Sequence, residues 1–201
     1  MTEQTKSEKT RKHILTKGRE LVLHGGFSGV GLSQILAASG VPKGSFYYYF
    51  TSKEDFGCAL LQDYVDDYLA RIDALISTPG TAGAKLDAFW SAWLDCGSTC
   101  GIASGCLVVK LAAEIADLSE DMRIILDRGV DQLTTRLAAL LRAGHTDGSV
   151  RPQPDPDATA RMLYAQWLGA AILSKLSQND TALRDALRDT TRRLSTEHSE
   201  T

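Results

Sequence analysis

The sequence predicts an all-α fold of about nine helices, in which a small N-terminal head is followed by a larger helical body. Apolar residues recur at intervals of three and four along the chain, and no useful stretch alternates as a β-strand would. Glycine and proline residues separate these periodic segments. Charge also divides the chain: residues 1–53 carry eight Lys and Arg against three acidic residues, a net +5, whereas residues 54–201 carry a net −8. We therefore expect two domains, residues 1–53 and 54–201.

The composition is that of a globular chain: of 201 residues, 43% are hydrophobic and 23% are charged. The first dozen residues are polar, and no apolar run approaches the roughly 18 residues of a membrane span. We therefore expect a cytoplasmic protein without a membrane segment, whose cysteines are reduced. No histidine follows the cysteines at zinc-finger spacing, so we expect no metal, and no motif indicates a cofactor.

Three helices are expected in the head. The first begins near Thr10 and ends at the Gly25-Gly26 pair. A short helix covers residues 32–38 and stops at Gly40, and the third follows Pro42, a residue that suits the first turn of a helix. These three short elements precede a long helix at residues 53–76.

The body continues with helices at about residues 84–96, 106–117, 119–143, 157–177 and 181–194. A Ser, Thr, Pro and Gly turn at residues 77–83 precedes the first of them, and a Gly-rich break spans residues 97–105. A Pro-rich stretch at residues 151–156 leads to the apolar helix 157–177. All of these elements are helical, which completes the all-α prediction.

Residues 31–50 have the layout of a helix-turn-helix. Leu32, Ile35 and Leu36 secure the first helix to the core, and Gly40 permits a tight turn at positive φ. Val41 is the apolar turn residue expected to lie beneath both helices. The segment therefore predicts a second helix that is held for presentation to a partner.

That second helix carries the side chains that a helix in a DNA groove needs. Lys43, Ser45, Tyr47 and Tyr48 supply a cation and hydroxyls for phosphates and base edges, and Gly44 permits close approach of the backbone. The alternative is a helical hairpin whose aromatic residues only fill the core, and we expect that role for Phe46 and Phe50. The whole pattern favours a site for double-stranded DNA.

The head resembles the TetR family of repressors. The matching residues are Gly26-Phe27, Ile35, Gly40-Val41, Lys43-Gly44-Ser45-Phe46-Tyr47, Tyr49-Phe50 and Ser52-Lys53-Glu54. The resemblance implies a TetR-type homodimer with a three-helix head, a C-terminal helical domain for ligand sensing and dimerisation, and an inverted-repeat operator. It places Lys43, Ser45, Tyr47 and Tyr48 at the DNA. It also implies that Lys53 caps the next helix against a phosphate, with Ser33 and Gln34 as further contacts.

The body resembles a narrower group of TetR-type repressors that sense reactive electrophiles or oxidants. The matching residues are Gly31 to Ser33, Val41 to Tyr47, Phe56-Gly57, Ser104 to Glu114, Asp117 to Arg123, Tyr164, Trp167 to Ala170 and Lys175. The resemblance implies that Cys106 is the sensing thiol and Lys175 the neighbouring amine. A sister group that senses acrylate-like compounds shares residues 41–47 and 105–107, so a non-covalent effector stays open.

The residues around Cys106 are consistent with a reactive thiol. Only the thiolate is a good nucleophile, and Cys106 stands at the start of a predicted helix, where the dipole favours an anion. Lys175 is the only charge between Arg161 and Asp180, and a buried ammonium requires a partner. Our hypothesis is that a contact between Cys106 and Lys175 is the switch. The alternative is that Cys106 is a small buried apolar residue and that the Lys175 side chain reaches the surface.

For the other cysteines and the aromatic residues of the body, both a functional and a packing interpretation stay open. Cys96 and Cys100 could be auxiliary, resolving thiols or packing residues. The body aromatics could line a ligand pocket or form plain core; they are Phe89, Trp90, Trp93, Tyr164 and Trp167. The last two helices carry more apolar surface than a small core needs, which favours a homodimer interface.

Together these features predict a DNA-binding transcriptional repressor that releases its operator when Cys106 reacts. The first alternative is a repressor with a non-covalent effector in the aromatic pocket. The second is a thiol-dependent enzyme, which has little support because no histidine forms a recognisable pair with a cysteine and no phosphate loop is present. We therefore expect no enzyme activity.

Overall fold

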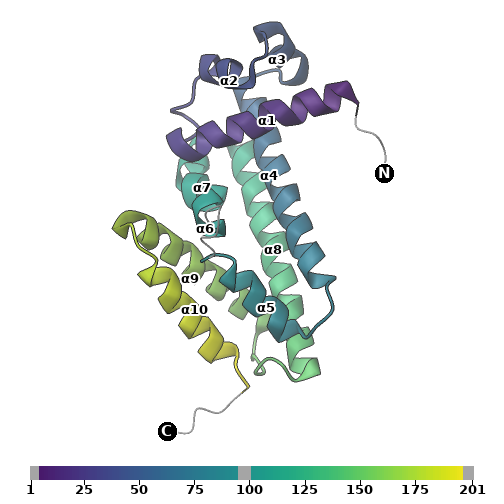
Figure 1. Ribbon diagram of the computed structural model, residues 1–201, viewed down its shortest axis with the longest axis vertical. Coiled ribbons are helices and arrows are strands. Elements are labelled where there is room, and N and C mark those ends of the chain that lie inside the picture. Colours follow the sequence, from purple (N-terminus) through teal and green to yellow (C-terminus); the bar gives the residue numbers. More distant parts are fainter. Residues whose placement is uncertain (1–4, 95–100, 197–201) are drawn as a thin grey trace. The chain divides into compact units, whose positions relative to one another are not determined.

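A computed structural model describes residues 5–94 and 101–196, and the regular structure in these two ranges is entirely helical (Figure 1). The helices are α1 (Lys6–Gly25), α2 (Leu32–Ser39), α3 (Lys43–Tyr49), α4 (Lys53–Ile76), α5 (Ala82–Ser91), α6 (Ile102–Gly105), α7 (Leu107–Leu118), α8 (Glu120–Asp147), α9 (Pro156–Ser177) and α10 (Thr181–Leu194). Nine of them correspond to the expected segments. The additional one, α6, is a single turn of four residues within the stretch expected to be a break.

The chain divides into two compact units by its internal contacts. The first contains residues 1–67 and 110–128, and the second contains residues 68–109 and 129–201. Helices α4, α7 and α8 contribute residues to both. The functional boundary expected after residue 53 coincides with the start of α4 and stays a prediction.

In the first unit, α1 begins four residues before the expected Thr10. Its N-terminus is closed by a reciprocal cap: the Glu8 amide donates to Thr5 Oγ1 at 3.2 Å, and the Thr5 amide donates to Glu8 Oε2 at 2.7 Å. Further along α1, Gly18 lies against Phe56, so close that a Cβ there would stand 2.2 Å from the ring. The absence of a side chain at Gly18 therefore sets how near Phe56 approaches α1.

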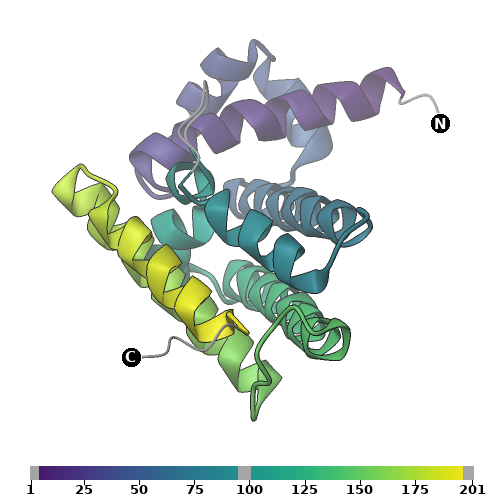
Figure 2. The ribbon, with the colours of Figure 1, turned by 60° about the horizontal axis from the view of Figure 1, so that its bottom comes forward.

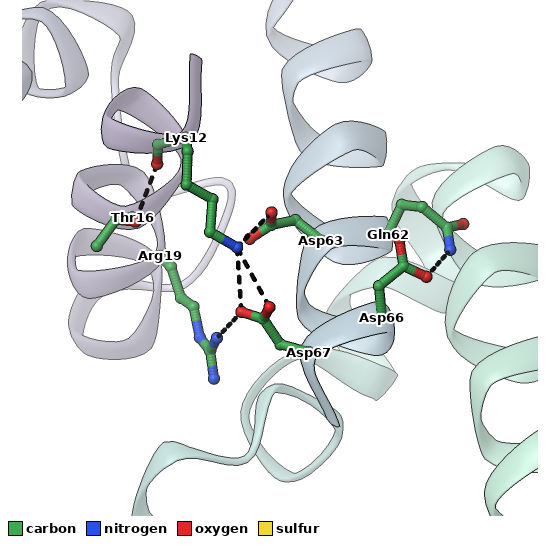
Figure 3. A network of polar contacts seen from close by, with 7 residues as sticks. All are labelled: Lys12, Thr16, Arg19, Gln62, Asp63, Asp66 and Asp67. Carbon is green, nitrogen blue, oxygen red and sulfur yellow. Dashed lines mark hydrogen bonds and ion pairs between the residues drawn. The ribbon is translucent and has the colours of Figure 1, made fainter. Parts of the chain in front are cut away.

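Ion pairs join α1 to α4 (Figure 3). The Lys12 ammonium lies 2.7 Å from Asp63 and 3.2 Å from Asp67, and Arg19 lies 3.8 Å from the same Asp67 carboxylate. Burial lowers the pKa of Lys12, but its bonds to Asp63 and Asp67 outweigh burial and raise the pKa. Two of the eight cations counted in residues 1–53 are thus neutralised by acidic residues of α4.

In the second unit, α9 and α10 lie side by side and run in opposite directions (Figures 1 and 2). The buried Trp167 indole donates to Thr190 Oγ1 at 3.0 Å and so ties the two helices together. Trp167 also stacks on Trp90 of α5, with ring centres 5.1 Å apart. Large aromatic side chains therefore form the core of this unit.

Two kinds of feature are absent from residues 5–94 and 101–196. No helix there is both long and apolar enough to cross a membrane. Nor does this part of the chain bring together three His, Cys, Asp or Glu side chains that could hold a metal ion.

Candidate nucleic-acid interface and sensing site

The turn between α2 and α3 has the geometry that the sequence predicts. Gly40 adopts φ 64° and ψ 21°, the left-handed conformation that glycine reaches without steric cost. Val41 is half-buried, and extended Pro42 immediately precedes α3. The positive φ expected at Gly40 is confirmed, so α2 and α3 form a helix-turn-helix.

The aromatic side chains of α3 and of Phe50, the residue after it, differ in how deeply they are buried. Phe46 and Phe50 are 0% and 1% exposed, and their rings contact each other and Phe56 with centres 5.2–5.5 Å apart. Tyr47 and Tyr48, by contrast, are 45% and 76% exposed. The core-filling alternative therefore explains Phe46 and Phe50 but leaves the two exposed tyrosines unexplained.

The other residues expected at DNA lie on α2, on α3 and at the start of α4. Lys43 and Gly44 are exposed and Ser45 is half-buried. Ser33 and Gln34 are exposed on α2, where Gln34 Oε1 accepts a hydrogen bond from the Gly31 amide at 2.7 Å. The Gln34 carbonyl thus supports the start of α2, while its amide nitrogen has no bond among the described residues.

Lys43 and Lys53, the two lysines beside the helix-turn-helix, differ from Lys12 and Lys17 in their partners. Neither has a carboxylate partner within the described residues, whereas Lys12 and Lys17 form ion pairs. The Lys53 ammonium lies 4.8 Å from the centre of the Phe27 ring, a cation–π contact that leaves its charge uncompensated. These two ammonium groups are therefore available for an anionic partner.

Two side chains of α7 make polar contacts in the first unit that were not expected from the sequence. Glu114 of α7 accepts hydrogen bonds from the Ser28 amide at 2.6 Å and the Phe27 amide at 3.1 Å, in the loop after α1. Lys110, one turn earlier on α7, donates to the His24 carbonyl at 3.1 Å. Burial alone raises the pKa of Glu114, but the bonds from Ser28 and Phe27 outweigh it and lower the pKa. A carboxylate and an ammonium of α7 thus hold the end of α1 and the loop that leads to α2.

Cys106 stands in the second unit, between the end of α6 and the first residue of α7. It is 2% exposed. Burial raises the pKa of Tyr68 and of Tyr164, and negative charge on Cys106 raises both further. The thiol therefore has two tyrosine hydroxyls within electrostatic range. The expected position at the start of a helix is confirmed.

Cys58, the other cysteine that the structure describes, has a different environment. It is half-buried on α4, in the first unit. Burial raises the pKa of Cys58, and the charges of Asp121 and Glu54 raise it further. A thiol with a raised pKa forms little thiolate at neutral pH, so Cys58 is a poor nucleophile. Cys96 and Cys100 lie outside the described residues.

Lys175 is exposed near the C-terminal end of α9, so the burial expected from its apolar neighbours is wrong. In the last turn of a helix, the long side chain reaches solvent while its stem covers apolar surface. Its contact with Cys106 stays a hypothesis. Lys175 does line a cavity of about 480 Å³.

The aromatic residues expected to form a ligand pocket are mainly in contact with one another. Trp90, Trp93 and Trp167 are each 1% exposed or less, and Trp93 contacts both Trp167 and Tyr164. Trp93 also lines the 480 Å³ cavity, and Phe89 lines a second cavity of about 270 Å³ beside Tyr68 and Arg71. Arg71 and Tyr68 were not expected at a pocket, since nothing in their local sequence distinguishes them.

Comparison with known proteins gives the family. Residues 14–56 match the bacterial regulatory proteins of the tetR family, and residues 82–190 match the tetracyclin repressor-like C-terminal domain. The chain is 41% identical to the HTH-type transcriptional repressor NemR of Escherichia coli, over 89% of this chain and 90% of that protein. It is 36% identical to the transcriptional regulator AcuR of Cereibacter sphaeroides, over 81% of this chain and 75% of that protein. The crystal structure of reduced E. coli NemR matches with a TM-score of 0.88 at 38% identity, covering 94% of this chain and 99% of that one. The chain belongs to the tetR family of bacterial regulatory proteins.

Proposed function

We propose that this protein is a transcriptional repressor that binds duplex DNA through α2 and α3 and releases it when Cys106 reacts with an electrophile or oxidant. The observation that carries the DNA-binding part is that Phe46 of α3 and Phe50, the residue after α3, are buried, whereas Lys43, Tyr47 and Tyr48 of α3 are exposed. An exposed helix with a cation and hydroxyls suits the major groove. The similarity to NemR, a repressor by name, supports the same function.

In this proposal the individual contacts have distinct roles. Lys43 and Lys53 bind phosphates, because their ammonium groups have no carboxylate partner among the described residues. Tyr47 and Tyr48 contact the groove with Ser45, and Gly44 lets the backbone of α3 approach the DNA. Ser33 and Gln34 add polar contacts from α2.

The protein acts as a homodimer in this proposal. An apolar stripe on α9 is exposed, and its large residues are Met162, Ile172, Leu173 and Leu176, at 61%, 46%, 57% and 76% exposure. Their spacing places them along one side of the helix. Exposed apolar surface of this kind marks a protein interface, and a two-fold pairing through α9 gives two heads for one inverted repeat.

The sensing step is covalent. The Cys106 thiolate adds to an activated carbon–carbon double bond such as that of N-ethylmaleimide; a thioether forms, and the carbanion that results takes a proton from solvent. The position of Cys106 before α7 supports this chemistry, because the helix dipole stabilises the thiolate. Because the site is 2% exposed, the added volume must displace its neighbours. Lys175 is the proposed amine partner of the resting thiolate.

Mass spectrometry tests the chemistry. After treatment with N-ethylmaleimide near one equivalent, we expect one adduct per chain, located at Cys106 by peptide mapping. Cys58 should react more slowly, because its pKa is raised by burial and by Asp121 and Glu54. Equal labelling of Cys58, or no labelling of Cys106, would contradict the sensing role.

Two alternatives give different results in the same experiment. A repressor with a non-covalent effector, for example an acrylate-like compound, releases DNA without a change in mass, and the two cavities lined by Trp93 and by Phe89 give it room. A thiol-dependent enzyme consumes more than one equivalent of electrophile per chain. We expect no such turnover.

A further inference from the structure

Three cations without a carboxylate partner stand in the first two turns of α1: Lys6, Lys9 and Arg11. All three are exposed, and none forms an ion pair within the described residues. The Arg11 guanidinium lies 5.4 Å from the centre of the Phe50 ring, a cation–π contact that leaves its charge uncompensated. The Lys and Arg residues further along α1 are all paired with acidic side chains; they are Lys12, Lys17 and Arg19. Uncompensated positive charge is therefore confined to the start of this helix.

The start of α1 is attached to the C-terminal end of α3. The Ser7 hydroxyl donates a hydrogen bond to the Tyr49 hydroxyl at 3.2 Å. The Tyr49 ring lies edge-on against the Tyr48 ring, with centres 4.9 Å apart. Tyr48 is 76% exposed and is one of the residues proposed to contact the DNA groove. The first turn of α1 is thus held beside the part of α3 that is proposed to bind DNA.

Lys6 and Lys9 share one side of α1 with His13, because residues spaced by three, four and seven positions lie above one another on a helix. His13 Nε2 donates to the carbonyl of Ser39, the last residue of α2, at 3.1 Å. Lys12, on a different side of α1, binds Asp63 of α4 at 2.7 Å. The two free ammonium groups therefore stand on the side of α1 that contacts the helix-turn-helix, and not on the side that pairs with α4.

The backbone amides at the start of α1 do not supply this positive charge. They are capped by Thr5 and Glu8, and the Glu8 carboxylate accepts hydrogen bonds from the Thr5 amide at 2.7 Å and the Thr5 hydroxyl at 3.1 Å. Glu8 is also the only acidic residue between Lys6 and Arg11, a segment whose net charge is 3 − 1 = +2. The surface is therefore made by lysine side chains, and its nearest carboxylate is already engaged.

We propose that Lys6 and Lys9 bind phosphates of duplex DNA beside the groove that α3 enters, so that α1 is a further DNA-contacting helix of the head. This inference rests on the proposed function and extends it to a helix outside the helix-turn-helix. A lysine ammonium is a point charge that binds a phosphate without reading a base, so these contacts add affinity and fix the orientation of the head. Arg11, held over Phe50, strengthens the positive potential of the same surface.

Fluorescence anisotropy of a labelled duplex selected for binding to the full chain, at several salt concentrations, tests these contacts. Lys6→Gln and Lys9→Gln should each lower the slope of log K against log salt by about 0.9, and the double variant by about 1.8, because each lysine releases one counterion. Lys17→Gln is the matched control on the same helix, since Lys17 is paired with Glu20, and it should leave the slope unchanged. Glutamine and lysine have similar helix propensities, so urea denaturation should give the same stability for the single and double variants.

The dependence on DNA sequence gives a second readout. Phosphates carry no sequence information, so the double variant should lose the same factor of affinity for an unrelated duplex of equal length, measured at low salt. The inference is overturned if the double variant keeps the slope of the unmodified chain, or if its loss is confined to the selected duplex. Binding that Tyr48→Ala weakens but the lysine variants do not would overturn this inference alone. An unmodified chain that binds no duplex would overturn the proposed function with it.

Discussion

Phe46 and Tyr48 are two residues apart on α3 and differ in burial. Phe46 is fully buried against Phe50 and Phe56, so Phe46→Ala should lower the free energy of unfolding by about 3–5 kcal/mol. Tyr48 is 76% exposed, so Tyr48→Ala should change it by less than about 0.5 kcal/mol while weakening DNA binding. Urea denaturation of both variants checks this, and a large loss of stability in Tyr48→Ala would show that Tyr48 is a core residue instead.

Lys43 should act on DNA through its charge. If it contacts one phosphate, Lys43→Ala lowers the slope of log K against log salt by about 1, because one fewer counterion is released. Lys17→Ala is the matched control, since Lys17 is paired with Glu20 at 2.9 Å and already compensated. Fluorescence anisotropy at several salt concentrations gives the slopes. An unchanged slope in Lys43→Ala would remove Lys43 from the interface.

At the scale of single elements, α7 stabilises the loop after α1 through Glu114. The pKa of Glu114 is lowered on folding, so the group stabilises the folded state above its unfolded pKa of about 4.3, and the stabilisation is lost as pH falls through the folded pKa. We expect Glu114→Gln to reduce stability at neutral pH and to flatten the loss of stability below about pH 4.3.

The control for Glu114 is Asp117→Asn, which removes an exposed carboxylate from the same helix. Chemical denaturation of the unmodified chain and both variants between neutral and acidic pH gives the curves. If the two variants show the same curve, the bonds from Ser28 and Phe27 do not contribute to stability.

The helices were predictable because each has a local signal. Apolar spacing located α4, and Gly40 located the turn between α2 and α3. The start of α1 was placed late because the Thr5–Glu8 cap lies in a polar stretch with no apolar period. The contact between Glu114 and Ser28 joins residues 86 positions apart, so no local pattern contains it.

Exposure near a helix end was harder to predict. Apolar neighbours in sequence suggested that Lys175 is buried, but Ile172, Leu173 and Leu176 are themselves exposed, and the Lys175 side chain extends to solvent. The exposed face of α3 was predicted correctly in Tyr47 and Tyr48, since burial of Phe46 and Phe50 fixes the rotation of a short helix.

For the whole molecule, α9 is the proposed dimer interface. Leu176 is 76% exposed, and Leu176→Glu places a charge within the apolar stripe, so we expect the dimer to dissociate and operator affinity to fall. Leu118→Glu is the control, because Leu118 is a 49% exposed apolar residue of α7 outside that stripe. Analytical ultracentrifugation measures the mass of each. A Leu176→Glu protein that stays dimeric would contradict pairing through α9.

The central claim is that DNA release is controlled at Cys106. The most direct test is fluorescence anisotropy of a labelled duplex that the protein is first selected to bind, titrated with N-ethylmaleimide at constant protein. We expect the unmodified chain and Cys58→Ser to release the duplex near one equivalent per chain, and Cys106→Ser to stay bound. Normal release by Cys106→Ser would contradict the claim.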